Sequence, residues 1–180
     1  MIDPKLVDES IQFVKKYHTI APFTMTNQNG QTITEKDYEN KVYVADFFFT
    51  TCPSICPIMT KNMFSLQEKL KTKYPEVKLL SYSVTPEIDT IEQLKRYAVK
   101  NKVDDKIWNL VTGDKKEIYT LARKSYLVVQ NDGNGGPHDM IHTENFVLID
   151  KENRIRGYYD GTDINEMDRL ITEIGMLKND

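Results

Sequence analysis

The sequence predicts an α/β fold in which helices flank a central mixed sheet, and three observations carry that prediction. Two β-branched and aromatic runs of strand length, 41–49 and 77–84, are apolar on both faces, as buried central strands are. Later in the chain, a short turn joins two strand-like segments into an antiparallel hairpin. Between the two central strands, apolar residues recur at the spacing of one helix face, at Met59, Met63, Leu66 and Leu70.

Length and composition favour a single globular domain over residues 1–180, in which residues 1–20 form an N-terminal arm. No internal repeat or linker divides the chain. The 39% hydrophobic content is ordinary, and no stretch of 18 apolar residues predicts a membrane span. A formal net charge of −3 argues against broad binding of nucleic acid or of anionic membranes.

The remaining elements follow from capping and turn residues. Residues 23–34 predict an extra hairpin with its turn at 27–30. Thr90 with Gln93 forms a capping box that opens a helix, and a strand follows at 106–112. Asp114 caps the next helix, which gives way to a predicted strand at 125–130.

Turn residues at 131–137 predict a loop after that strand. Segments 144–150 and 154–160 then form the antiparallel hairpin, and Asp163 with Glu166 opens a last amphipathic helix. The resulting order of elements, βαβ, then αβ, then ββα, is that of a thioredoxin-like central mixed sheet with an additional N-terminal hairpin.

The only two cysteines, Cys52 and Cys56, lie between the two central strands, and each is followed by proline. Because proline disfavours the α region for the residue before it, we expect both cysteines in the strand-to-helix loop, with the helix starting at Pro57. The helix dipole would then lower the thiol pKa values. The pair could form a disulfide or hold a metal; the alternative is two buried, inert cysteines.

Two thiolates leave a metal under-coordinated, so a third ligand is sought among the histidines. His142 directly precedes the strand-like segment 144–150, at a sheet edge that the predicted fold brings beside the cysteine loop. His138 lies in the glycine-rich loop and is the alternative ligand, whereas His18 precedes the main fold and is expected to be exposed or to pack. Met140 is a minor candidate. Met59 and Met63 share the apolar helix face and are expected in the core.

The chain resembles the Sco/SenC family of copper proteins of cytochrome c oxidase assembly in three segments: DFFFTTCPSICPIMTKNM, SYSVTPEIDTIEQLKRYA and IHTENFVLID. The resemblance implies a thioredoxin-like fold and a copper site, for Cu(I) or Cu(II), made by Cys52, Cys56 and His142. It also implies a membrane tether in the full-length protein and a location on the exported side of the membrane, periplasmic or equivalent. Ile141 stands where the family commonly has Asp.

The residues together with this resemblance leave two functions open. The first is delivery of copper to a cytochrome c oxidase copper-site subunit or another copper protein by a monomeric carrier. The second is thiol-disulfide exchange by the same cysteine pair on a copper-site protein. Peroxidase activity is disfavoured because Phe49 and Ala45 replace the Thr and Pro of that active site. A structural zinc site lacks a fourth ligand, and the glycines of 131–137 lack the lysine and helix of a phosphate loop.

Overall fold

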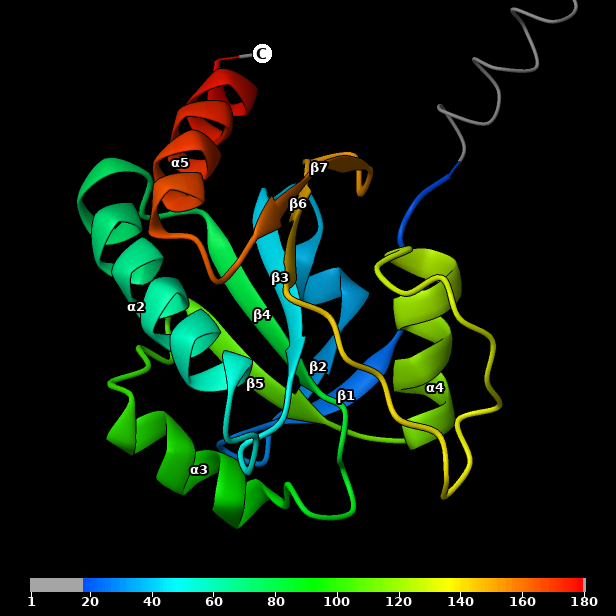
Figure 1. The fold of residues 1–180 in the computed structure, drawn as a ribbon. Coiled ribbons are helices and arrows are strands. Elements are labelled where there is room, and N and C mark those ends of the chain that lie inside the picture. Colours follow the sequence, from blue (N-terminus) through cyan, green and yellow to red (C-terminus); the bar gives the residue numbers. More distant parts are fainter. Residues whose placement is uncertain (1–17, 180) are drawn as a thin grey trace, which may run out of the picture.

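The computed structural model describes residues 18–179, which form a central sheet covered by helices on both faces (Figure 1). Most of the expected N-terminal arm lies outside the described residues. Within them, no helix has both the length and the apolar character needed to cross a membrane. The strands are β1 (Thr24–Asn27), β2 (Thr32–Thr34), β3 (Tyr43–Phe48), β4 (Lys78–Ser83), β5 (Trp108–Thr112), β6 (Asn145–Ile149) and β7 (Ile155–Asp160). The helices are η1 (Glu35–Tyr38), α2 (Ile55–Lys73), α3 (Ile91–Lys100), α4 (Lys115–Thr120), the π-helix η2 (Leu121–Ser125) and α5 (Ile164–Lys178).

The sheet is mixed and has the strand order β2-β1-β5-β4-β3-β6-β7. Strands β3, β4 and β5 pair in parallel, and the outer pairs are antiparallel. The two runs predicted to be central, which became β3 and β4, do lie in the middle of the sheet. Because a parallel neighbour requires a crossover, helices α2 and α3 join these strands. The architecture is the predicted thioredoxin-like one.

Alternate side chains of β3 enter two separate hydrophobic clusters, one on each face of the sheet. Val44 and Phe48 pack with α2, α3 and α5, whereas Tyr43, Ala45 and Phe47 pack with α4 and the N-terminal hairpin. Burying each large apolar side chain contributes about 1.5–3 kcal/mol. The strand is therefore fixed from both sides, and the loop that follows it starts from a rigid element.

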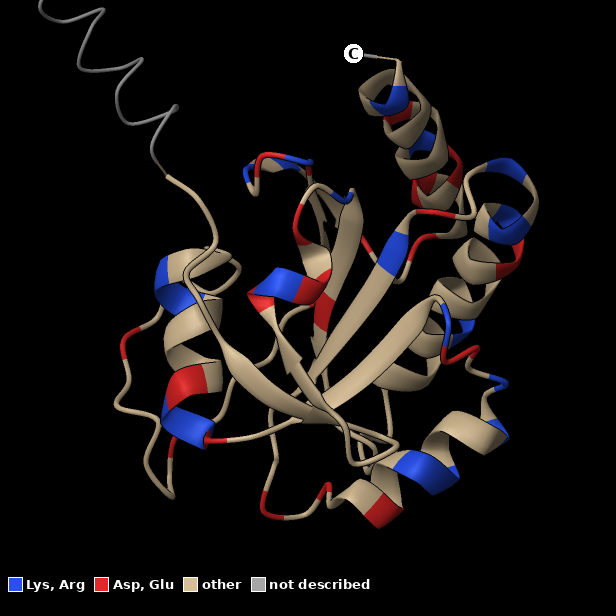
Figure 2. Ribbon diagram, turned by 180° about the vertical axis from the view of Figure 1, so that it is seen from behind, with Lys and Arg blue, Asp and Glu red and all other residues tan. Residues whose placement is uncertain are grey.

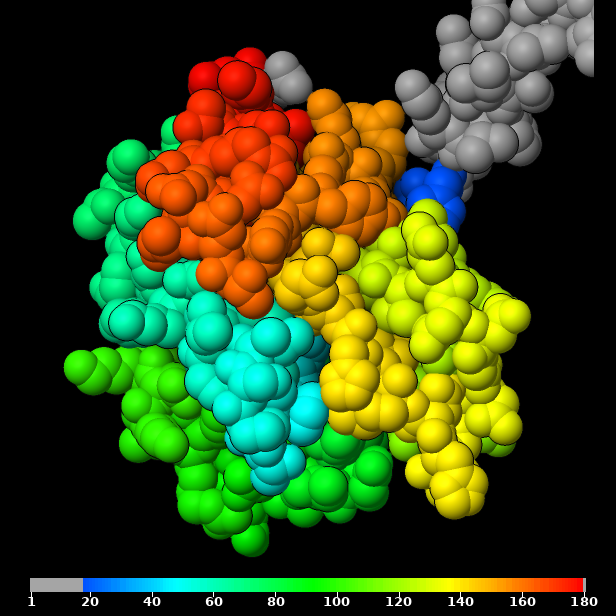
Figure 3. Space-filling model, viewed as in Figure 1, coloured from blue at the N-terminus to red at the C-terminus, as the bar shows by residue number. Residues whose placement is uncertain are grey.

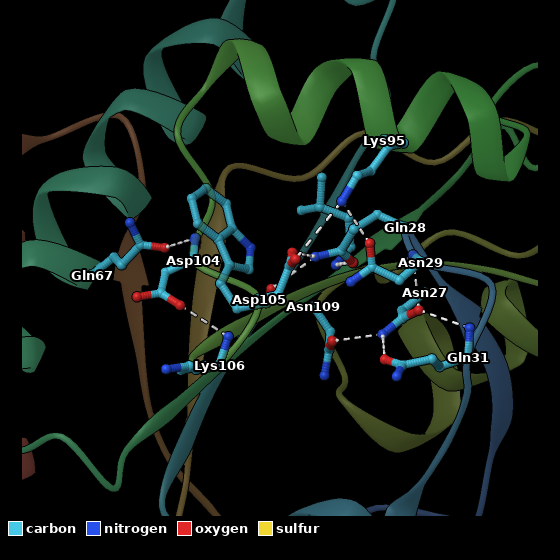
Figure 4. Close-up of polar contacts among 12 residues, drawn as sticks. Asn27, Gln28, Asn29, Gln31, Gln67, Lys95, Asp104, Asp105, Lys106 and Asn109 are labelled. Carbon is cyan, nitrogen blue, oxygen red and sulfur yellow. Dashed lines mark hydrogen bonds and ion pairs between the residues drawn. The ribbon is translucent and has the colours of Figure 1, made fainter.

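The N-terminal hairpin forms where predicted, with its turn closed by a hydrogen bond from Gly30 N to Asn27 O of 3.0 Å. A buried amide joins this hairpin to β5 and to the turn before it. Gln28 Nε2 donates to Asp105 Oδ1 at 2.8 Å (Figure 4). Gln28 Oε1 accepts from Leu110 N of β5 at 2.9 Å. Asn27 Nδ2 also donates to an oxygen of β5, Asn109 Oδ1. These contacts continue the sheet beyond the short backbone pairing of β1 with β5.

Helix caps follow the predicted residues with one difference. Asp114 and Asp163 are the N-caps of α4 and α5, and their side chains accept backbone hydrogen bonds. Thr90 caps α3 by accepting from Gln93 N at 3.2 Å. The side chain of Gln93 does not return to Thr90 but donates to Thr50 Oγ1 at 3.0 Å, so only half of the predicted capping box forms. Gln93 instead links α3 to the cysteine loop.

The predicted strand at 125–130 is wrong, because this segment ends a helix. Leu121–Ser125 is π-helical, Tyr126 N donates to Leu121 O at 2.7 Å, and Val128 N donates to Ala122 O at 2.9 Å. Between them, Leu127 adopts a left-handed φ of 55°. The aromatic and β-branched side chains that led to the strand prediction pack into the hydrophobic cluster on the α4 side of the sheet. Their burial in the tertiary structure explains the strand-like composition of this segment.

Figure 2, turned by 180° from Figure 1, shows Lys and Arg residues interspersed with Asp and Glu residues along the helices and turns.

Candidate metal centre

The two cysteines lie where β3 gives way to α2, at the carboxyl end of a central parallel strand. Cys52 is in the loop, but Cys56 is the second residue of α2, which begins at Ile55 and not at Pro57. The predicted helix start is therefore wrong by two residues. Proline is tolerated there because the first four N–H groups of a helix have no intrahelical partner. Cys56 thus belongs to the first helical turn.

Both cysteines are free and buried, yet their thiols differ chemically. Burial acts to raise the pKa of Cys52, but hydrogen bonds from the Cys56 thiol, the backbone of Ser54 and Cys56, and the Ser54 hydroxyl outweigh it and lower this pKa. Burial and the hydrogen bond given to Cys52 raise the pKa of Cys56 to about 12. The predicted lowering of the thiol pKa is confirmed for Cys52 and wrong for Cys56. Cys52 is therefore the more readily ionised sulfur.

A buried carboxylate anchors the cysteine loop from the α3 side. Asp89 is fully buried and accepts hydrogen bonds from Thr50 N at 3.2 Å and from Thr50 Oγ1 at 2.5 Å. Its Oδ2 also accepts from Ser83 Oγ at 2.7 Å and Thr85 Oγ1 at 3.1 Å. Since several donors offset the cost of burying a carboxylate, Asp89 is held firmly and fixes the residue two positions before Cys52.

His142 approaches this loop from the segment that precedes β6. The imidazole is exposed and meets the ring of Phe49 edge-on, with 6.1 Å between the ring centroids. His142 and Cys56 line one narrow pocket together with Phe47, Phe49, Ile55, Val84, Ile141 and Thr143. Figure 3 shows the cysteine loop, in cyan, in contact with the segment that carries His142, in yellow.

The donor set suits a soft metal, because two thiolates and one imidazole are the ligands that Cu(I) prefers. Over residues 18–179, however, no three His, Cys, Asp or Glu side chains already lie close enough together to hold a metal ion. The fold thus brings Cys52, Cys56 and His142 to the carboxyl end of β3 without placing all three in ligating geometry.

The other candidate ligands lie elsewhere. His138 is exposed and lines a separate, open hollow with Asp132, Gly133, Asn134 and Asp139. Met140 directs its sulfur to Tyr119, whose hydroxyl approaches it at 3.7 Å. His18 Nε2 lies 3.0 Å from Ser125 O, far from the cysteine loop in the sequence and in the fold.

The two helical methionines are core residues, as expected. Met59 and Met63 are completely buried in the cluster between α2 and the sheet. Their position on the apolar face of the predicted helix indicated this burial.

A buried acid close to the cysteines was not predicted. Asp46 lies on β3 with 2% of its surface exposed and accepts a hydrogen bond from Ser81, which in turn accepts from Trp108 Nε1 at 3.0 Å. Burial raises the pKa of Asp46 to about 7, and its charge contributes to the raised pKa of Cys56. The sequence did contain an indication of this buried acid, because a carboxyl within the apolar run YVADFFF is expected to be buried with its neighbours.

Comparisons with known proteins show which family the chain resembles in sequence and structure. The SCO1/SenC family model matches residues 12–178. A SCO1/SenC family lipoprotein from Bacillus anthracis is similar in structure, with a TM-score of 0.78 and 32% identity over 90% of this chain and 96% of that one.

Two further solved structures are similar. BsSco, described as a member of the Sco family of cytochrome c oxidase assembly proteins with a disulfide switch, matches with a TM-score of 0.78 and 32% identity over 90% of this chain and 94% of its own. Arabidopsis thaliana ScoI with copper bound matches with a TM-score of 0.69 and 26% identity over 87% of this chain and 98% of its own.

Proposed function

The chain belongs to the SCO1/SenC family, and on that premise we propose that it binds copper through Cys52, Cys56 and His142 and delivers it to, or prepares, the copper site of cytochrome c oxidase. The observation that carries the proposal is the pocket shared by Cys56 and His142 beside the loop of Cys52. The copper-bound relative and the oxidase-assembly relative support the metal and the pathway.

The thiols have distinct parts in this proposal. Cys52, whose pKa is lowered, offers the first thiolate to the incoming ion. Cys56 must lose its proton on binding, since only the thiolate is a good ligand. The exposed imidazole of His142 then completes a three-coordinate site, which leaves the copper open to attack by thiols of an acceptor protein.

Thiol-disulfide exchange is the second candidate, favoured by the opposite pKa shifts of the pair. The Cys52 thiolate attacks one sulfur of a partner disulfide, whose other sulfur leaves as a thiolate. Cys56 gives up its proton to solvent and attacks Cys52 in the mixed disulfide, releasing the second partner thiolate. The partner gains two electrons, and Cys52 and Cys56 become a disulfide.

The same relatives support a cellular location and a partner. The similarity to a family lipoprotein supports an anchored protein on the exported side of the membrane, periplasmic or equivalent. The partner is the copper-site subunit of the oxidase or another copper protein, and the carrier acts as a monomer.

An anaerobic Cu(I) competition titration against a chelator tests the copper proposal. The wild-type protein should bind one equivalent tightly, His142→Ala should bind much more weakly, and His138→Ala should match the wild type. His142→Ala should still form the Cys52–Cys56 disulfide, which separates the two candidate functions. Equal copper binding by wild type and His142→Ala would overturn the ligand assignment.

A further inference from the structure

A part-buried ion pair joins η2, which continues α4, to the segment that carries His142. Arg123 Nη1 lies 2.5 Å from Asp139 Oδ2, and Arg123 Nη2 lies 2.7 Å from Asp139 Oδ1, a bidentate arrangement. Both side chains are only 9% exposed. Two parallel charge-assisted hydrogen bonds fix orientation as well as distance, so the carboxylate has one defined place relative to the helix.

Arg123 and Asp139 also hold the rest of the loop. Arg123 Nε donates to Asn131 O at 2.9 Å, and Gly135 N donates to Asp139 Oδ2 at 2.8 Å. The beginning, middle and end of segment 131–139 therefore meet at one ion pair. Gly133 packs directly against it, since a Cβ on Gly133 would overlap both Arg123 and Asp139. We call this arrangement of Arg123, Asp139 and the loop around them the clasp.

The clasp is followed by residues that leave His142 little backbone freedom. After Asp139, the sulfur of Met140 meets the hydroxyl of Tyr119, and Ile141 is 1% exposed. Thr143 on the other side is buried as well. Within 139–143, His142 alone is exposed, so its imidazole can turn while the backbone on both sides stays anchored.

The helix that supplies Arg123 is irregular at that point. Residues 121–125 are π-helical, and the chain leaves them through Leu127, whose positive φ is uncommon for a leucine. Irregular backbone of this kind persists where the surrounding structure requires it, and this one lies where Arg123 meets Asp139.

Stability alone does not account for such a pair. Desolvating two charges costs free energy that their attraction only partly repays, and a packed apolar pair is often as stable. The specific gain from a bidentate pair is position. We propose that Arg123 and Asp139 are positioning residues for His142: they fix the backbone of 139–143 so that the imidazole reaches the cysteines by side-chain rotation. This inference rests on the proposed copper site.

The test compares Arg123→Lys and Asp139→Asn with the wild type. Lysine keeps the positive charge but cannot form the two parallel hydrogen bonds to the carboxylate or the bond to Asn131 O. Asparagine keeps the shape of aspartate without its charge. Each variant should lower Cu(I) affinity about tenfold to a hundredfold, as loss of partners that orient a ligand does. In the Cu(II)-loaded form, the nitrogen coupling from imidazole in the electron paramagnetic resonance spectrum should weaken, while the Cys52–Cys56 disulfide still forms. A merely structural ion pair would leave that spectrum unchanged.

Asp150→Asn is the matched control. Asp150 is 7% exposed and pairs with Arg154 at 3.2 Å and Arg156 at 3.1 Å in the β6–β7 hairpin, away from the clasp. This control should lose stability without losing copper affinity or the nitrogen coupling. The proposal is overturned if Arg123→Lys and Asp139→Asn keep both properties, or if Asp150→Asn loses them equally.

An incorrect copper assignment would be recognised by a different result, namely wild-type copper affinity in His142→Ala. The positioning role would then be refuted as well, because it depends on His142 as a ligand. A protein in which His142→Ala weakens copper binding while both clasp variants bind normally would retain its copper site and refute the positioning role alone.

Discussion

Cys56 and His142 line the same narrow pocket, one from the first turn of α2 and the other from the segment that leads into β6. The cysteine loop is fixed through Thr50 and the buried Asp89. The histidine segment is fixed through Asp139 and Arg123. Each half of the candidate site is therefore held by its own carboxylate, and the two halves meet beyond the carboxyl end of β3.

Alkylation should distinguish the two thiols. Because its pKa is lowered, Cys52 should react with limiting iodoacetamide near neutral pH well before Cys56, whose pKa is raised to about 12. Peptide mass spectrometry of partly modified protein measures the order. In Cys56→Ser, a hydroxyl still donates to Cys52, so Cys52 should remain reactive, whereas Cys56 should stay slow in Cys52→Ser. Equal rates for the two sulfurs would contradict the asymmetry.

Copper affinity should rise with pH. Cys56 is protonated at every pH below about 12, so binding must release its proton, and each proton released raises the affinity about tenfold per pH unit. Below the lowered pKa of Cys52, a second proton is released and the slope should double. Chelator competition across pH, corrected for the chelator's own protonation, measures this slope. A flat profile above the pKa of Cys52 would mean that Cys56 is not a ligand.

Asp46 should make the protein less stable as pH rises. Its pKa is raised from 3.8 to about 7 by burial, so the folded state holds a proton that the unfolded state has lost between those values. The contribution is fully present below pH 3.8 and is lost by about pH 7, a change of about 4 kcal/mol at 1.36 kcal/mol per unit.

Asp46→Asn removes this titration. The difference in free energy of unfolding between variant and wild type should therefore shift by about 4 kcal/mol in favour of the variant from pH 4 to pH 8. Urea unfolding at the two pH values is the measurement. If the difference stays constant, the carboxyl does not change its protonation state in this range.

Leu127→Asn should stabilise the fold. Leu127 has a φ of 55° and a side chain that is 48% exposed, and asparagine adopts this conformation at lower cost. We expect an increase of about 1 kcal/mol in the free energy of unfolding, measured by thermal or urea denaturation. A decrease would mean that the leucine side chain supplies packing that outweighs its backbone strain.

Much of this arrangement could be predicted from local sequence. The apolar runs identified β3 and β4, apolar residues at the spacing of one helix face identified α2, and the position of the cysteines between strand and helix placed their loop at the end of a central strand. His142 was selected because it precedes a strand that the predicted fold brings beside the cysteine loop, and this strand, β6, pairs with β3. The mixed sheet and both hairpins are confirmed.

The rest depends on contacts that the sequence does not display. Arg123 and Asp139 are ordinary charged residues in the sequence, and only the folded chain shows that they pair. The segment at 125–130 has strand-forming residues because Tyr126 and Val128 are buried against the α4 side of the sheet. The opposite pKa shifts of the cysteines arise from burial and hydrogen bonds within one turn, which spacing alone does not reveal.

The central claim is that Cys52, Cys56 and His142 together hold copper, and X-ray absorption spectroscopy at the copper edge tests it most directly. Protein loaded anaerobically with one equivalent of Cu(I) should show two sulfur scatterers and one imidazole nitrogen. His142→Ala should lose the nitrogen and keep the sulfurs, whereas His138→Ala should match the wild type. A wild-type spectrum with sulfur alone, or a nitrogen that persists in His142→Ala, would contradict the assignment.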